Sequence, residues 1–133
     1  MTPLDPLTVQ QEGAQVLPGG PEKIVPPSGL EVTLQDVVWN APGPMGLTLR
    51  FRFVAPGLAA TEGEIDYDAL ALDMQWLCQN FALPRVPQPG PQPAQIVISL
   101  SDVAVPFGEP SPEATQLFEA YSVQDGQCVW DFF

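Results

Sequence analysis

The segment Leu47-Thr48-Leu49-Arg50-Phe51-Arg52-Phe53 has the most regular alternation of apolar and polar residues in the chain. Successive side chains of a β-strand point to opposite faces of its sheet, so this pattern predicts a strand that is buried on one face. We expect the leucines and phenylalanines to face a core, and the threonine and both arginines to face the other way. Residues 55–57, Ala-Pro-Gly, predict the end of the strand.

Two more alternating runs lie before and after this segment. Residues 30–35 alternate at the same period, and at residues 36–39 the alternation slips by one position, which is typical of a β-bulge. Residues 40–44, Asn-Ala-Pro-Gly-Pro, then predict a turn. Residues 96–101 form another run with one apolar face, and residues 103–107 are a candidate extension of it.

The run of residues 115–123 has two interpretations. As a helix, it would have Ser111 as its N-cap and Pro112 at its first position. As a strand, it would form a hairpin with residues 128–130 through the turn Asp125-Gly126. We favour the strand because the Asp-Gly pair joins two runs that are rich in aromatic and β-branched residues.

Residues 65–81 predict the main helix, because their apolar residues recur at spacings of three and four. Asp66 is the expected N-cap, Ile65 and Leu70 occupy the positions of a hydrophobic staple, and Pro84 follows the last turn. Leu72 and Trp76 lie one turn apart outside the main stripe, so the helix is either buried over a wide arc or offers an apolar patch to a partner. The residues expected to face the core are Tyr67, Leu70, Ala71, Met74, Leu77, Cys78 and Phe81.

Two segments are rich in proline and have no sustained periodicity. Residues 1–28 predict an extended arm, which is an inert tail or a strap that orders on a partner. Residues 84–93 predict a stiff connector between the helix and the next strand. With 133 residues and 45% hydrophobic composition, the remaining residues 29–133 suffice for one domain. We expect an α+β fold, in which one main helix packs on a small, mostly antiparallel sheet of about five strands and a proline-rich arm precedes the domain.

Cys78 and Cys128 are the only cysteines, and each lies on the apolar side of an expected element. This placement predicts a structural disulfide and an oxidising compartment, namely the periplasm or the exterior. Residues 1–29 lack the basic and apolar regions of a signal peptide, so an exported form would have lost its signal. The alternative is a cytoplasmic protein with two reduced, buried thiols. A redox-catalytic pair is disfavoured, because the two residues lack Cys-x-x-Cys spacing.

The charge of the chain is strongly negative, with 16 acidic and 4 basic residues and a net charge of −12. Nucleic acids and anionic membrane surfaces reward clustered cations, so we expect neither as a partner. No apolar run reaches the roughly 18–20 residues that cross a bilayer, and we expect no membrane insertion. A basic protein, or a membrane complex, is the partner that this charge favours.

The residue types exclude most familiar catalytic sites. The chain has no histidine, and its single lysine, Lys23, lies in the predicted arm. Histidine-dependent nucleophiles, the usual zinc sites and a buried catalytic lysine are therefore not expected. The alternating carboxylates at residues 62–68 lack the spacing and the central glycine of a calcium loop. We predict no catalytic residue, no metal and no cofactor.

Arg50 and Arg52 make up half of the cations and share the polar face of their strand. They are candidates for contact with an anion or with the carboxylates of a partner. The alternative is that they pair across the sheet with Glu31 or other local acids. The apolar residues Leu72 and Trp76 are the second candidate contact surface, since exposed tryptophans are common interface anchors.

The runs VVWN (37–40), GLTLRFRFV (46–54), DMQWLC (73–78), PAQIVISL (93–100) and FEAY (118–121) resemble those of a small family of uncharacterised alphaproteobacterial proteins. The resemblance covers roughly residues 29–133. It implies an exported protein, with no established activity or catalytic residues. Some members carry the label acetolactate synthase, which this sequence does not support, because thiamine diphosphate enzymes of that kind are much larger chains.

The function expected from these observations is that of a non-enzymatic periplasmic accessory or binding protein. It would engage a larger protein complex through its acidic surface and its N-terminal arm. The alternative is a small carboxylate-based enzyme or ligand-binding protein of the envelope, which requires a pocket lined by acids or by Arg50 and Arg52.

Overall fold

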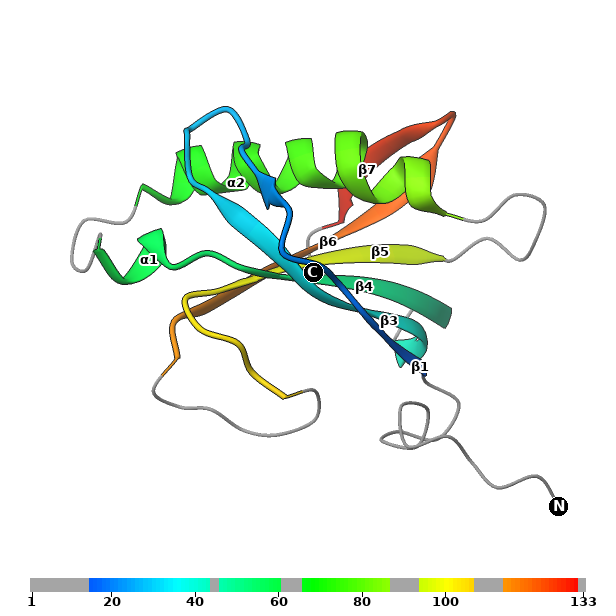
Figure 1. Cartoon of the computed structure of the whole chain (residues 1–133). Coiled ribbons are helices and arrows are strands. Elements are labelled where there is room, and N and C mark those ends of the chain that lie inside the picture. Colours follow the sequence, from blue (N-terminus) through cyan, green and yellow to red (C-terminus); the bar gives the residue numbers. More distant parts are fainter. Residues whose placement is uncertain (1–14, 44–45, 61–65, 87–93, 107–113, 132–133) are drawn as a thin grey trace, which may run out of the picture.

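The computed structural model describes residues 15–43, 46–60, 66–86, 94–106 and 114–131, and it places one long helix against one face of a sheet (Figure 1). The helix is α2 (Tyr67–Leu77), which continues into a π-helical turn (Cys78–Ala82) and a 3₁₀ turn (Leu83–Arg85); α1 (Gly57–Ala60) is a single turn. The strands are β1 (Gln15–Pro18), β2 (Lys23–Ile24), β3 (Val32–Gly43), β4 (Gly46–Val54), β5 (Gln95–Ser101), β6 (Gln116–Gln124) and β7 (Gln127–Asp131).

The strands form a single sheet in the order β1-β3-β4-β5-β6-β7, and β2 also pairs with β3. The central pair β4 and β5 is parallel, and every other pair is antiparallel. Parallel strands need a long crossover connection, and here the connection contains α2. The crossover therefore places the helix on one face of the sheet.

The expected fold class was wrong. The described chain is mostly sheet, with seven strands instead of about five and with α2 as its only helix of more than one turn. The five expected strands are present as β3 to β7. The other two, β1 and β2, come from residues 15–24, which the sequence analysis assigned to the arm. Their four and two residues are too few to show a periodicity, and they are held by backbone pairing along the outer edge of β3.

Several local predictions are confirmed. Register shifts between Leu34 and Asp36, and between Val38 and Ala41, interrupt the pairing of β3 with β4 close to the expected bulge. The strand interpretation of residues 115–123 is correct. In the β6–β7 turn, Asp125 and Gly126 have φ angles of 52° and 74°, as a two-residue hairpin turn requires. The turn expected at residues 40–44 is displaced, because β3 continues to Gly43, and residues 44–45 lie outside the described ranges.

The helix begins as predicted, because the Asp66 side chain accepts a hydrogen bond from the Ala69 N–H at 3.1 Å. The predicted core stripe is correct only in part. Tyr67 is 62% exposed and Ala71 is also exposed, whereas Asp73 is fully buried. Ile65, the expected staple residue, lies outside the described ranges. The apolar residues of the stripe that are buried are Leu70, Met74, Leu77 and Cys78.

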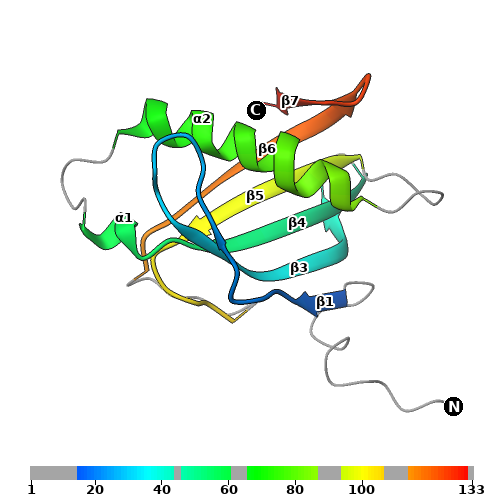
Figure 2. The ribbon, with the colours of Figure 1, turned by 45° about the horizontal axis from the view of Figure 1, so that its top comes forward.

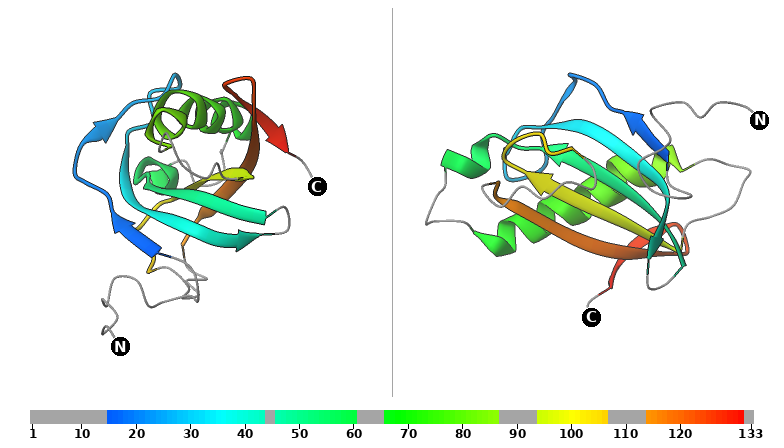
Figure 3. Two further views of the ribbon diagram at one scale, coloured as in Figure 1. Left: turned by 90° about the vertical axis from the view of Figure 1, so that its right-hand side faces the viewer. Right: turned by 90° about the horizontal axis from the view of Figure 1, so that it is seen from below.

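The core lies between α2 and the sheet (Figure 2). The sheet curves around the helix when the helix is seen end-on (Figure 3, left). The phenylalanines of β4 face this core, as their alternation predicted. Phe81 packs edge-on against both, with ring centroids 6.3 Å from Phe51 and 5.5 Å from Phe53. The Arg85 guanidinium carbon also lies 3.5 Å from the centroid of the Phe81 ring. This stack closes the core where the helix ends.

The predicted disulfide is confirmed. Cys78 and Cys128 are bonded with their Cα atoms 6.2 Å apart, and the bond joins the π-helical turn to the edge strand β7. Two amides of α2 and its extension reinforce this junction: Gln75 Nε2 donates to the Cys128 carbonyl at 2.6 Å, and Gln79 Oε1 accepts from the Cys128 N–H at 2.9 Å. In the described ranges, no helix is long and apolar enough to cross a membrane.

Candidate functional site

The two arginines of β4 lie on the sheet face opposite α2, which we call the arginine face. Strand alternation places them there, because the phenylalanines of the same strand are buried against the helix. In the register of the sheet, Asp36 of β3 and Ser99 of β5 flank Arg52. Val38 and Val97 flank Arg50 in the same way. One row of paired residues across the centre of this face is therefore polar throughout, and in the neighbouring row Arg50 lies between two valines.

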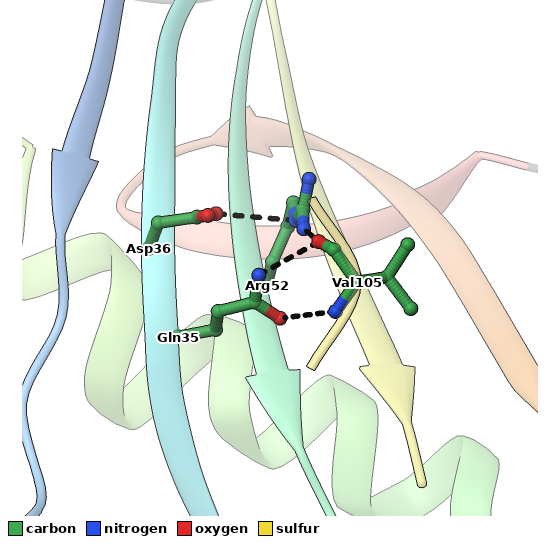
Figure 4. A network of polar contacts seen from close by, with 4 residues as sticks. All are labelled: Gln35, Asp36, Arg52 and Val105. Carbon is green, nitrogen blue, oxygen red and sulfur yellow. Dashed lines mark hydrogen bonds and ion pairs between the residues drawn. The ribbon is translucent and has the colours of Figure 1, made fainter. Parts of the chain in front are cut away.

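Arg52 belongs to a buried ion pair (Figure 4). Its Nε atom lies 3.1 Å from Asp36 Oδ1, and its Nη2 atom donates to the Val105 carbonyl. Burial raises the pKa of Asp36, and the opposing effect of the Arg52 charge is smaller. Burial likewise lowers the pKa of Arg52 more than Asp36 raises it. The charge of Arg52 is thus neutralised within the sheet, which is the structural alternative that the sequence analysis considered.

The bulge residue Gln35 ties a connecting segment to this face (Figure 4). Gln35 Nε2 donates to the Val105 carbonyl at 2.7 Å, and Gln35 Oε1 accepts from the Val105 N–H at 3.2 Å. Residues 102–106 therefore lie across the arginine face and are not an extension of β5. Sequence reasoning missed this contact, although the slip in the alternation of β3 marked the bulge that produces it.

Arg50 differs from the three other cations. It is partly buried, and its Nε atom is buried without a hydrogen-bond partner. Among the residues that the structure describes, Arg50 has no ion pair. Glu31, one of its expected partners, pairs instead with Lys23, with Oε1 3.4 Å from the lysine Nζ. Burial and, to a smaller extent, the charge of Arg52 lower the pKa of Arg50. The arginine face therefore carries one charge that the described residues leave uncompensated.

A second carboxylate on the arginine face, that of Asp131, already accepts hydrogen bonds from neighbouring side chains. Its Oδ2 atom accepts from Gln95 Nε2 at 3.2 Å, and its Oδ1 atom accepts from the Ser122 hydroxyl at 3.0 Å. In the sheet register, Asp131 lies three strands away from Arg50, beyond Val97 and Ala120. Neighbouring strands are about 4.8 Å apart, so three strand spacings exceed the distance over which an aspartate and an arginine side chain ordinarily meet. We therefore do not expect Asp131 to pair with Arg50.

The two residues of the candidate patch on α2 differ in exposure. Leu72 is 68% exposed, whereas Trp76 is partly buried and packs against the core. Three other exposed apolar residues lie on the β6–β7 hairpin: Phe118 is 68% exposed, Val129 39% and Trp130 51%. In the register of the sheet, Phe118 and Val129 lie on the arginine face, whereas Trp130 lies on the face that carries α2. The sequence analysis assigned these three residues to strands but did not single them out as a surface.

Sequence reasoning also missed the buried carboxylate of Asp73. It accepts hydrogen bonds from Ser28, with the backbone N–H 3.0 Å from Oδ1 and the hydroxyl bonded to Oδ2. The signal was present, because Asp73 lies three residues after Leu70 and four before Leu77, on the core stripe. The contact joins the segment that precedes β3 to the middle of α2, so its role is structural.

One hollow of about 430 Å³ lies at the edge of the sheet beside α1. The ion pair of Lys23 and Glu31 contributes to its wall, and the rest of the lining is mostly apolar. Within the described ranges, no group of three or more His, Cys, Asp or Glu side chains is arranged to bind a metal ion. The residues that line the hollow are Lys23, Gly29, Leu30, Glu31, Val32, Thr33, Val54, Pro56 and Gly57.

The chain belongs to a family of unknown function, DUF6497, whose sequence model matches residues 7–133. The match confirms the expectation of an uncharacterised family. It also extends the family region into residues 7–28, which include β1 and β2. No protein of curated function and no solved structure is significantly similar to the chain.

Proposed function

We propose that this chain is a non-enzymatic binding protein that engages a partner protein through its β6–β7 hairpin. The observation that carries the proposal is the exposure of Phe118, Val129 and Trp130 on this one hairpin. Large aromatic side chains supply much of the binding energy at protein interfaces, and tryptophan is the most enriched among them. Phe118 and Val129 lie on one face of the hairpin and Trp130 on the other, so the partner would contact the hairpin from both sides.

The hairpin is held in position by covalent and polar contacts. The disulfide at Cys128 fixes β7 to the end of α2, and Gln75 and Gln79 bond to the Cys128 backbone. The Trp130 indole N–H donates to Glu119 Oε2 at 2.6 Å. A surface that is ordered before binding loses less conformational entropy in a complex, which favours affinity.

We place the protein in an oxidising compartment, as an exported, periplasmic or secreted accessory subunit. The disulfide supports this location, because such bonds persist outside the reducing cytoplasm. The net charge of −12 favours a basic protein or a membrane complex with an exposed cationic surface as the partner. The earlier expectation that the arm makes the contact is not kept for residues 15–24, because they pair with β3.

Affinity purification from the native envelope tests this proposal. The wild-type chain is compared with Phe118→Ser and with Leu72→Ser, since both side chains are 68% exposed but only Phe118 lies on the hairpin. We expect a stoichiometric partner to co-purify with the wild type and with Leu72→Ser, and to be lost with Phe118→Ser. Equal recovery with both variants, or isolation of the wild type only as a free monomer, would contradict the proposal.

A further inference from the structure

We infer that the β6–β7 hairpin binds an arginine side chain of its partner protein through Trp130 and Glu119, on the sheet face that carries α2. The inference rests on the proposed function, because it names the chemistry that a partner of this hairpin presents there. It concerns different side chains from Phe118 and Val129, which lie on the opposite face of the hairpin.

Glu119 breaks the alternation of β6. Every second residue of this strand points to the face that carries α2, and in the sheet register Glu119 lies beside the fully buried Ile98. The other members of that row belong to the core or pack against it: Leu117, Tyr121 and Val123. A partly buried carboxylate thus occupies a position where the pattern calls for a core residue. Departures of this kind from a local folding rule are expected at functional sites.

Glu119 and Trp130 form a fixed pair. The indole N–H of Trp130 donates to Glu119 Oε2 at 2.6 Å, and in the sheet register Trp130 lies beside Tyr121, two residues after Glu119. The disulfide at Cys128, two residues before Trp130, ties the same strand to the end of α2. Because Trp130 is 51% exposed, the pair presents an aromatic ring to solvent with a carboxylate at its edge.

No lysine or arginine of the chain neutralises Glu119. All four of these residues are among those that the structure describes, and none forms an ion pair with Glu119. Two pair with other carboxylates, one stacks on a phenylalanine ring and one lies on the arginine face: Lys23, Arg52, Arg85 and Arg50, in that order. Partial burial reduces the screening of the Glu119 charge, so an external cation would be attracted more strongly than at a fully exposed carboxylate.

The combination of ring and carboxylate matches a guanidinium. Arginine stacks on the face of an indole through its planar group, and its N–H donors fit the oxygens of a carboxylate. A lysine ammonium carries the same charge, but it has neither the planar surface nor the paired donors. The net charge of −12 attracts any basic segment, whereas Trp130 and Glu119 would select arginine within it.

Selection from a random peptide library displayed on phage tests the inference. The full, oxidised chain is the bait, in parallel with the variants Glu119→Gln, Trp130→Leu and Glu22→Gln. Glu119→Gln keeps an acceptor for the indole N–H and removes only the charge. Glu22→Gln is the matched control, because it removes the same charge from an exposed residue between β1 and β2, near the opposite edge of the sheet.

We expect the wild type and Glu22→Gln to enrich arginine over lysine at one fixed position of the selected peptides, relative to the unselected library. Glu119→Gln and Trp130→Leu should lose this preference. In the best peptide, replacement of that arginine by lysine should weaken binding to the wild type about fivefold, and replacement by the uncharged citrulline about tenfold. Fluorescence anisotropy of the labelled peptides measures both ratios, which should shrink with Glu119→Gln.

Equal enrichment of arginine and lysine, or an arginine preference that persists in Glu119→Gln, would overturn the inference. Thermal unfolding identifies a variant that has lost its fold, and if Trp130→Leu has done so, Glu119→Gln decides. Arginine-free peptides whose binding is lost with Phe118→Ser would refute the arginine site and leave binding by the hairpin intact. Arginine peptides that require Glu119 would support the site even if no partner co-purified, in which case the proposed function alone would fail.

Discussion

Gly19 shows how a single residue sets the edge of the sheet. Its N–H donates to the Gln35 carbonyl at 2.8 Å, and the next N–H, of Gly20, donates to the Leu34 carbonyl at 3.1 Å. A Cβ atom on Gly19 would lie 1.9 Å from the Leu34 carbonyl oxygen, whereas one on Gly20 would meet nothing within 4 Å. The backbone of the segment between β1 and β2 therefore needs a glycine at position 19 to approach β3.

The substitution Gly19→Ala should lower the free energy of unfolding by about 2 kcal/mol or more, because the clash is with backbone that cannot move away freely. Gly20→Ala is the matched control, and it should be neutral or stabilising by up to about 1 kcal/mol, through reduced freedom of the unfolded chain. Urea denaturation of the two variants and the wild type measures both values. Equal stability of the two variants would show that the segment does not pack against β3 in this way.

At the scale of elements, the β6–β7 hairpin combines a locally encoded turn with long-range restraints. The Asp125-Gly126 turn and the alternating strands could be predicted because they depend on neighbouring residues. The hydrogen bonds of Gln75 and Gln79 to the Cys128 backbone could not be predicted, because they depend on where α2 lies. Such side-chain contacts occupy backbone groups of an edge strand that would otherwise invite pairing with another chain.

Removal of the disulfide should loosen this hairpin. The bond closes a loop between residues separated by 50 positions, and the loop-closure model gives it a stabilisation of about 4 kcal/mol. The double variant Cys78→Ala/Cys128→Ala should therefore unfold at clearly lower urea concentration than the oxidised wild type. Dithiothreitol should lower the stability of the wild type but leave that of the double variant unchanged. Two free thiols in the denatured, unreduced protein would refute the bond itself.

For the whole molecule, the segment before β3 closes one side of the fold. β1 and β2 pair with the outer edge of β3, and Ser28 bonds to the buried Asp73 of α2. This segment thus connects the sheet edge to the helix that covers its core. The predicted boundary between arm and domain at residues 28 and 29 missed these contacts, because a proline-rich composition conceals short strands.

A chain truncated to begin at residue 30 should lose its cooperative unfolding transition or aggregate. The truncation exposes the edge of β3 and leaves the Asp73 carboxylate buried without its two donors. Ser28→Ala is the milder control, since it removes only the hydroxyl donor and should cost about 1–3 kcal/mol. Size-exclusion chromatography and circular dichroism melting follow both chains. A truncated monomer as stable as the wild type would rule out a structural role for residues 15–29.

The amino-acid sequence by itself determined the strands β3 to β7, the hairpin turn, the N-cap of α2 and the placement of the two cysteines on apolar faces. These features depend on residues close together in the chain, where periodicity and turn chemistry act. Only the tertiary structure decided the pairing of β1 and β2 with β3, the partial burial of Trp76 beside the exposed Leu72, and which arginine of β4 has an ion pair. The bonds of Ser28 to Asp73 and of Gln35 to Val105 join residues 45 and 70 positions apart. No local pattern specifies such contacts, because they form only when the sheet and the helix have brought distant segments together.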